Sequence, residues 1–117
     1  MGTPVVGDVV IIPFPYSDLS KSKHRPALVV ADVGRGDYVL SQITSKPYDD
    51  PHALSLSEID FSDGGLRRES FVRVGKLFTA NEVLTLGIAG RLTYSKLAEV
   101  ISLLVGMFSS ALKDDTS

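Results

Sequence analysis

The chain has no cysteine, only two histidines and no uninterrupted apolar run near the ~18 residues of a membrane span. Without cysteine, disulfides and thiolate-bound metals are excluded, and the compartment stays open. Neither histidine has a partner at metal-ligand spacing, so we expect no metal site and no cofactor. Because no basic N-terminal region precedes an apolar run, we expect neither secretion nor membrane insertion, and a cytoplasmic location is the simplest expectation.

The sequence also lacks an excess of positive charge. Its 12 Lys and Arg and 14 Asp and Glu give a formal net charge of -2, which argues against a protein that coats nucleic acid without selectivity. What is present is 44% apolar residues in 117 positions, enough for one core but not for two comfortable domains. We therefore expect one domain over residues 1–112 and a short polar tail, 113–117, that is flexible.

Short β-branched and apolar stretches, separated by proline and glycine, predict that most of the chain forms strands. Glycines at 34 and 36 favour a tight hairpin turn between the second and third of these. We expect the polar stretches 62–65 and 79–82 to be turns. The predicted strands are residues 8–16, 27–33, 38–45, 53–57, 70–78 and 87–92.

From Thr93 or Ser95, apolar residues recur at spacings of three and four, which predicts an amphipathic helix. Several short strands followed by one helix predict an α+β fold, a small, strongly bent antiparallel barrel with the helix over one open end. Fold alone indicates no function. The apolar stripe expected to face the sheet consists of Leu97, Val100, Ile101, Leu104, Phe108 and Ala111.

The most informative stretch is a basic turn, residues 21–25, that passes through Arg25-Pro26 into an aliphatic strand. Pro26 disfavours the helical region for Arg25 and so holds the arginine at the strand entrance. The planar guanidinium suits phosphate and stays protonated at physiological pH. On the residues alone, a structural or merely solvated arginine is the alternative explanation.

Three further motifs accompany Arg25-Pro26. Gly7-Asp8-Val9-Val10 opens the first strand, Ile43-Thr44-Ser45 ends the third, and Ser70-Phe71-Val72-Arg73 lies in a later one. In this order and spacing, the motifs resemble the MazF/PemK (Kid) family of toxins from type II toxin-antitoxin systems. The resemblance runs from about Gly7 to the terminal helix.

The resemblance implies an SH3-like barrel that forms a homodimer and cleaves single-stranded RNA, usually messenger RNA, at specific sequences without a metal. It also implies a cognate antitoxin, and DNA bound through the toxin-antitoxin complex. By position, Arg25 matches the catalytic arginine, Thr44 acts with it beside Ser45, and Arg73 matches a second arginine of the PemK branch. That branch has an aspartate two residues later, where this sequence has Gly75, so its acid-base apparatus is incomplete here.

Cutting RNA without a metal requires activation of the 2′-hydroxyl, stabilisation of a dianionic phosphorane and protonation of the leaving 5′-oxygen. The products are a 2′,3′-cyclic phosphate and a 5′-hydroxyl. Arg25 suits the stabilising role, although a pKa above about 12 makes it a poor base. Thr44 and Ser45 could bind the phosphate or orient the 2′-hydroxyl. His24 titrates near neutral pH, but in an extended chain it points away from its neighbour Arg25.

Basic residues are expected to gather at one rim of the barrel, with the acidic residues Asp49, Asp50, Asp60, Asp63 and Glu99 elsewhere. A solvated loop face is the alternative explanation. An RNA track at this rim would use aromatic side chains to stack bases, for which Phe14, Tyr16 and Tyr48 are candidates. The residues predicted to bind substrate are Ser45, Lys21, Lys23, His24 and Lys76, and Arg67, Arg68 and Arg73 belong to the same basic group.

Four apolar residues outside the helical stripe, namely Leu84, Leu86, Val105 and Met107, have no obvious partner within the chain. We expect them to form the patch of a two-fold homodimer that joins two basic rims. Two other functions stay open: a CcdB-like toxin of the same fold class that poisons DNA gyrase without cutting RNA, and an inactive member that only binds antitoxin or RNA. Arg25-Pro26 together with Thr44-Ser45 favours the endoribonuclease.

Overall fold

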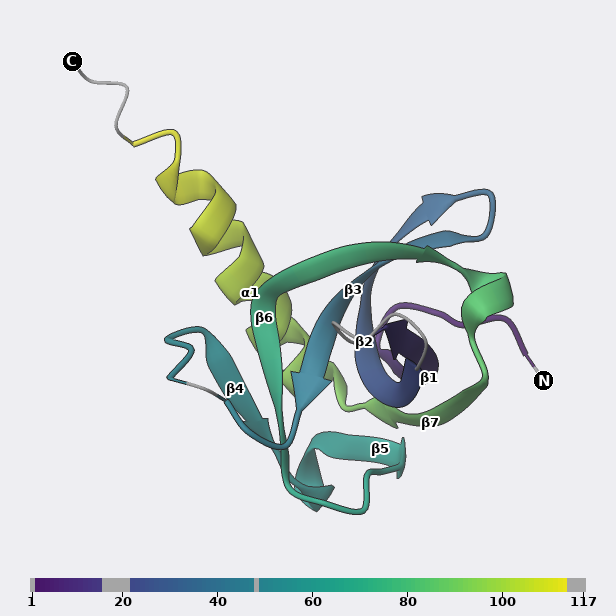
Figure 1. Cartoon of the computed structure of the whole chain (residues 1–117). Coiled ribbons are helices and arrows are strands. Elements are labelled where there is room, and N and C mark those ends of the chain that lie inside the picture. Colours follow the sequence, from purple (N-terminus) through teal and green to yellow (C-terminus); the bar gives the residue numbers. More distant parts are fainter. Residues whose placement is uncertain (1, 16–21, 48, 114–117) are drawn as a thin grey trace.

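The computed structural model describes residues 2–15, 22–47 and 49–113, which form one curled antiparallel sheet and a C-terminal helix (Figure 1). The strand order is β4-β6-β3-β2-β1-β7-β5. No helix in these ranges is long and apolar enough to cross a membrane. The elements are β1 Asp8–Pro15, β2 Ser22–Gly34, β3 Asp37–Thr44, β4 Ala53–Leu56, β5 Phe61–Gly64, β6 Ser70–Asn81, β7 Gly87–Leu92, α1 Tyr94–Ser110, and 3-10 turns at Glu58–Asp60 and Glu82–Leu84.

The predicted strands and helix are all present, and the bent antiparallel α+β architecture is confirmed. The basic turn predicted at residues 21–25 is wrong for residues 22–25, which belong to β2 and pair with β1. The turn predicted at 62–65 is instead β5 as far as Gly64, which pairs with β7. The turn predicted at 79–82 is also wrong, because β6 continues to Asn81 by pairing along the full length of β3. Asn81 then caps the short helix that follows, where its side chain accepts a hydrogen bond from Val83 N.

Two buried clusters lie on opposite faces of the central strands, because alternate residues of a strand point to opposite sides. Val9 and Leu28 belong to the larger cluster, which Val100 and Leu104 of α1 cover. Val10 and Val29, their neighbours in sequence, belong to the smaller cluster. The near-continuous apolar runs of β1 and β2 therefore reflect burial on both faces.

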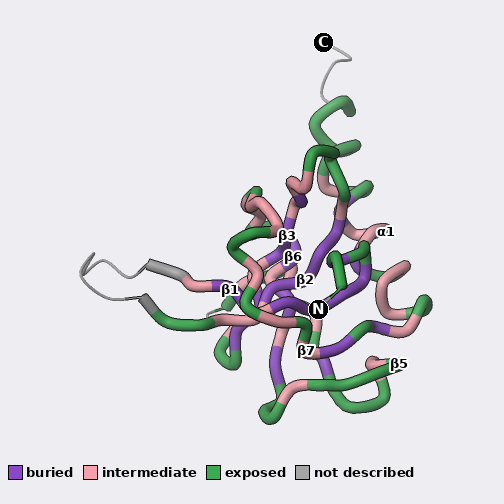
Figure 2. Tube along the Cα trace, turned by 90° about the vertical axis from the view of Figure 1, so that its right-hand side faces the viewer, coloured by how far each residue is buried: buried purple, intermediate pink, exposed green. Residues whose placement is uncertain are grey.

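α1 begins where predicted, at Thr93, whose hydroxyl accepts a hydrogen bond from Lys96 N at 3.1 Å. Such a cap contributes about 1 kcal/mol. The apolar stripe ends sooner than predicted: Phe108 is 63% exposed and Ala111 is also exposed. Figures 1 and 2 show why, since the last turns of α1 extend beyond the sheet that they would need to pack against. Met107, expected to lack a partner, instead packs against the larger cluster.

The Gly7-Asp8 motif joins two strands. Asp8 is buried, and its carboxylate accepts hydrogen bonds from Arg91 Nε and from Val5 N, both at 2.9 Å. Hydrogen bonding to Asp8 raises the pKa of Arg91. Gly7 has a φ of 100°, a conformation that favours glycine. The motif therefore ties the start of β1 to β7.

Candidate functional site

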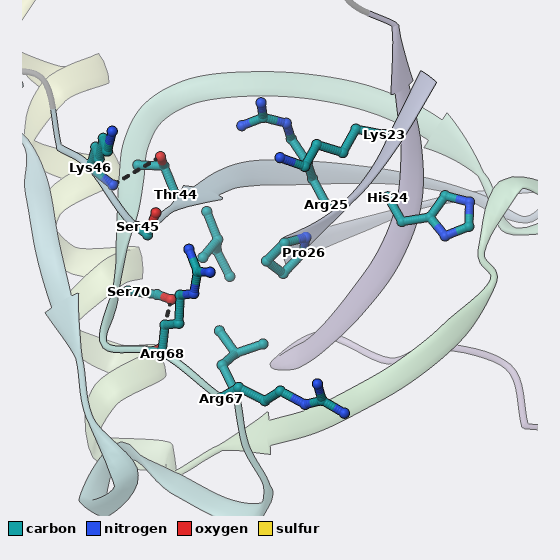
Figure 3. Close-up of a pocket in the computed structure, with 12 residues that line it drawn as sticks. Lys23, His24, Arg25, Pro26, Thr44, Ser45, Lys46, Arg67, Arg68 and Ser70 are labelled. Atoms are coloured by element: carbon teal, nitrogen blue, oxygen red, sulfur yellow. Dashed lines mark hydrogen bonds between the residues drawn. The ribbon is translucent and has the colours of Figure 1, made fainter. Parts of the chain in front are cut away.

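A pocket of about 460 Å³ opens where β2 begins and β3 ends (Figure 3). The antiparallel ladder between β2 and β3 begins at Ala27 and Gln42. Before Ala27, Arg25 pairs with Ile12 of β1. Arg25 and Thr44 thus lie on adjacent strands just beyond their paired part, where both line the pocket. We call this site the basic pocket; it is lined by Lys23, His24, Arg25, Pro26, Ile43, Thr44, Ser45, Lys46, Leu66, Arg67, Arg68 and Ser70.

The charge of the basic pocket is of one sign. Five lining side chains are Lys or Arg, and no Asp or Glu is among the described residues that line it. A hollow with this lining concentrates anions, and the guanidinium groups offer paired donors that fit phosphate oxygens. Across the described ranges, no group of three or more His, Cys, Asp or Glu is placed to hold a metal ion.

Two hydrogen bonds hold the walls of the basic pocket. The hydroxyl of Thr44, a buried residue, accepts a hydrogen bond from Lys46 N at 3.1 Å, which fixes the path of the chain as it leaves β3. The Ser70 hydroxyl donates to the carbonyl oxygen of Arg68 at 3.0 Å and ties the preceding loop to β6. In Figure 3 the polar ends of Arg25, Thr44 and Arg68 turn toward a common space.

Most of the predicted site residues that the structure describes line the basic pocket, namely Lys23, His24, Arg25, Thr44 and Ser45. Figure 3 shows the His24 ring pointing away from Thr44 and Ser45, as alternation along the strand predicts. Lys46 and Ser70 also line the pocket and were not predicted as site residues; the position of Lys46 directly after Thr44-Ser45 was the available signal. The predicted contributors Lys21, Tyr16 and Tyr48, the side chain of Phe14 and most of the tail lie outside the described residues.

Arg73 and Lys76 do not line the basic pocket. Arg73 Nε lies 2.9 Å from Asp50 Oδ2, and both side chains are mostly buried. The other carboxylate oxygen of Asp50 accepts from His52 N at 2.8 Å. The hydrogen bond from Arg73, reinforced by the one from His52, holds the pKa of Asp50 below its ordinary value.

The expectation that Asp50 lies away from the basic residues is therefore wrong. Asp50 N donates to the Pro47 carbonyl oxygen at 3.0 Å, a turn that returns the loop after β3 toward β6. That loop starts with Ser45 and Lys46 at the basic pocket, so the Arg73–Asp50 pair joins to β6 the same loop that supplies part of the pocket lining.

Gly75 lies at an irregularity in β6. Phe71 to Val74 alternate as predicted, with Val72 and Val74 buried. On β3 the neighbours Ser41 and Gln42 pair with Leu77 and Arg73 of β6, so the register shifts between these two pairs. Gly75 lies within the shifted part, where strict alternation no longer predicts that it shares a face with Arg73. A Cβ added at Gly75 would lie 2.7 Å from Met107 Cε of α1.

The sequence from residue 6 to residue 108 matches a family described as PemK-like, MazF-like toxin of type II toxin-antitoxin system. No curated protein matches the sequence. The match extends over almost all of β1 to α1 and includes the basic pocket.

Solved structures share the fold at low sequence identity. MazF in the MazE-MazF complex from Deinococcus radiodurans has a TM-score of 0.74 and 18% identity, with 93% of this chain and 98% of that chain covered. An endoribonuclease from a mycobacterial species, in complex with its cognate antitoxin, has a TM-score of 0.65 and 17% identity, with 92% of this chain and 93% of that chain covered. Toxin MazF-mt6 from Mycobacterium tuberculosis has a TM-score of 0.56 and 18% identity, with 79% of this chain and 91% of that chain covered. These likenesses confirm the barrel-like fold.

Proposed function

This chain belongs to the family of PemK-like, MazF-like toxins of type II toxin-antitoxin systems, and we propose that it is an endoribonuclease that cleaves single-stranded messenger RNA at a specific sequence. The observation that carries the proposal is the basic pocket, which Arg25 and Thr44 line together with four further Lys and Arg side chains. One solved structure of the same fold carries the name endoribonuclease, which supports the same reading.

In the proposed mechanism the basic pocket holds the scissile phosphate. The guanidinium of Arg25 donates to the phosphorane oxygens as negative charge develops on them. The Thr44 hydroxyl already accepts a hydrogen bond from Lys46 N, so its own proton can be donated to a phosphate oxygen. Ser45 lies beside it at the pocket rim. Attack by the 2′-hydroxyl then yields a 2′,3′-cyclic phosphate and a 5′-hydroxyl.

We propose that this cleavage does not use a metal, because the fixed cations supply the charge neutralisation that a divalent ion would otherwise provide. Lys23 and His24, with Lys21 outside the described residues, would extend the RNA contact along the entrance of β2. Arg73 would act from behind the pocket through Asp50, and Lys76 would contact only the outlying part of the RNA.

The proposed partners are a cognate antitoxin, which neutralises the toxin in the cytoplasm and joins it to DNA in the complex, and a second copy of this chain. An apolar hollow of about 440 Å³ between α1 and the sheet supports the two-fold homodimer, since Phe108 and Leu104 line it together with Val39 and Leu77. We expect ~25 kDa by light scattering at micromolar concentration, twice the chain mass of 12.6 kDa. Phe108→Arg should shift the mass toward the monomer, whereas a wild-type monomer with full RNase activity would contradict a homodimer that joins two basic rims.

The function is tested by incubating purified protein with a panel of single-stranded RNAs in excess EDTA and analysing the new ends. We expect cleavage with 2′,3′-cyclic phosphate and 5′-hydroxyl ends, and none at a site where the 2′-hydroxyl is replaced by hydrogen. Dependence on added metal, or 5′-phosphate products, would refute the mechanism. Inhibition of gyrase without any RNA cleavage would favour the CcdB-like alternative.

A further inference from the structure

A second pocket, also of about 460 Å³, adjoins the basic pocket. The two share the segment Leu66, Arg67 and Arg68, which forms a common wall. The rest of the second lining comes from the end of β4, the following 3-10 turn, β5 and the loop that leads into β6. We call it the glutamate pocket; it is lined by Leu56, Ser57, Glu58, Phe61, Gly64, Gly65, Leu66, Arg67, Arg68 and Glu69.

The glutamate pocket differs from its neighbour in charge. Glu58 and Glu69 are exposed, and within the described ranges neither forms an ion pair with Arg67 or Arg68 or any other hydrogen bond through its carboxylate. Carboxylates beside an RNA backbone repel its phosphates and so lower nonselective affinity. Placed in a hollow next to the phosphate site, they suit a neutral group that donates hydrogen bonds.

The glutamate pocket has the volume and the partly apolar lining that one nucleic-acid base requires. Leu56 is buried, and Phe61 and Leu66 are half-buried, so part of the lining is apolar. Gly64 has a φ of 64° and packs so closely on the Ala89 carbonyl that a Cβ would collide with it. Gly65, by contrast, has open space where a Cβ would lie. The volume lies within the range of small-molecule sites, and an unstacked base is the ring that single-stranded RNA presents.

We propose that the glutamate pocket receives one unstacked base of the RNA, and that Glu58 and Glu69 accept hydrogen bonds from an exocyclic amine of that base. This inference rests on the proposed function, because it assigns the base next to a phosphate held in the basic pocket. Arg67 and Arg68, in the shared wall, contact the phosphate that links the two sites.

The chemistry discriminates between the two pyrimidines. Cytosine carries an amine at position 4, which donates to a carboxylate, whereas uracil carries a carbonyl oxygen there, which a carboxylate repels. The pocket therefore selects cytosine over uracil. A good base contact of this kind changes affinity by about tenfold or more.

The test is direct binding of fluorescent nonamers made of 2′-O-methyl cytidine or 2′-O-methyl uridine, which cannot be cleaved by 2′-hydroxyl attack. We expect the wild-type protein to bind the cytidine oligomer about tenfold more tightly at equal salt. Glu58→Gln and Glu69→Gln should each strengthen uridine binding and reduce the cytidine-to-uridine ratio at least threefold. Glu99→Gln, an equal charge change on α1, should leave the ratio unchanged.

A steric variant provides a second readout without a charge change. Gly65→Val places a side chain in the open space of the pocket and should weaken cytidine-oligomer binding severalfold. The inference would be overturned, with RNA binding itself unaffected, by a cytidine-to-uridine affinity ratio near one in the wild-type protein. It would also be overturned if both Glu→Gln substitutions left this ratio unchanged. Binding of neither oligomer would overturn the proposed function as well.

Discussion

Two arginines that resemble the catalytic residues of one family occupy opposite kinds of surroundings. Arg25 lies in β2, paired with Ile12 of β1, in a pocket whose lining contains Lys and Arg but no carboxylate among its described residues. Arg73 lies in β6, mostly buried, with Asp50 2.9 Å from its Nε. Among the described residues, the lining of the first region is cationic, whereas the second region holds a carboxylate within hydrogen-bond distance of its arginine.

The difference shows that a shared residue type does not fix a shared role. A pocket lined by five Lys and Arg side chains favours phosphate, since phosphate relieves their mutual repulsion. A guanidinium that is already hydrogen-bonded to a carboxylate has less to gain and serves better as a fastening. We therefore assign Arg25 to the reacting phosphate and Arg73 to positioning of the loop that carries Ser45 and Lys46.

The largest expected effect is on catalysis at Arg25. Arg25→Ala should lower kcat at least ~100-fold, the order found when one donor to a developing anion is removed. Circular dichroism should show an intact fold. Lys113→Ala, which removes one positive charge from an exposed site near the C-terminus, serves as the control and should retain activity. Near-wild-type cleavage by Arg25→Ala would remove this residue from the site.

The next largest effect is on the free energy of unfolding, to which the Arg73–Asp50 pair should contribute. A double-mutant cycle of Arg73→Gln and Asp50→Asn in urea should give a coupling free energy of about 1–2 kcal/mol, because the pair is hydrogen-bonded but not fully buried. Lys96→Gln with Glu99→Gln, a pair at 3.1 Å in which the Glu99 side chain is about half exposed, should give less than about 0.5 kcal/mol.

The kcat values of the same two variants test whether Arg73 has a role apart from its pairing with Asp50. If the pair only positions the loop, Arg73→Gln and Asp50→Asn should lower kcat by similar factors. A much larger loss for Arg73→Gln than for Asp50→Asn would instead show that Arg73 contacts the RNA, as the family resemblance implies.

A smaller effect separates Lys46, which lines the basic pocket, from Lys76, which does not. Lys46→Ala should raise the KM for RNA severalfold. It should also make KM less dependent on salt concentration, by the amount expected for the loss of about one phosphate contact. Lys76→Ala makes the same charge change on β6 and should have little effect on either quantity. Equal effects would mean that the RNA track extends well beyond the pocket.

The smallest effect is a pH dependence of stability. Because the pKa of Asp50 is lowered in the folded protein, the pair contributes fully above the ordinary value of 3.8 and is lost as the pH falls through the lowered pKa. The difference in unfolding free energy between wild type and Asp50→Asn should be constant from about pH 7 to about pH 5 and shrink below that. A difference that grows on acidification would contradict the lowered pKa.

A single neighbour, Pro26, predicts the extended backbone of Arg25, which the pairing of Arg25 with Ile12 confirms. That Thr44 lies near Arg25 depends instead on the strand order, which places β3 beside β2. The Arg73–Asp50 pair was not predictable in this way, since it depends on a turn that returns Asp50 over β6. β5 was missed because Ser62-Asp63-Gly64 has the composition of a turn, and only its pairing with β7 makes it a strand. Periodicity extended the buried helix face to Phe108, but periodicity contains no information on where the sheet ends.

The neighbourhood of Gly75 has an evolutionary consequence. The atom nearest to a new side chain there is the terminal methyl of Met107, the free end of a flexible chain, and no backbone atom lies within 4 Å. A substitution that adds a Cβ at this position therefore needs one flexible side chain to move and no shift of the backbone, so it is open to a lineage that keeps this fold. The hydrogen bond between Arg73 and Asp50 does not involve residue 75.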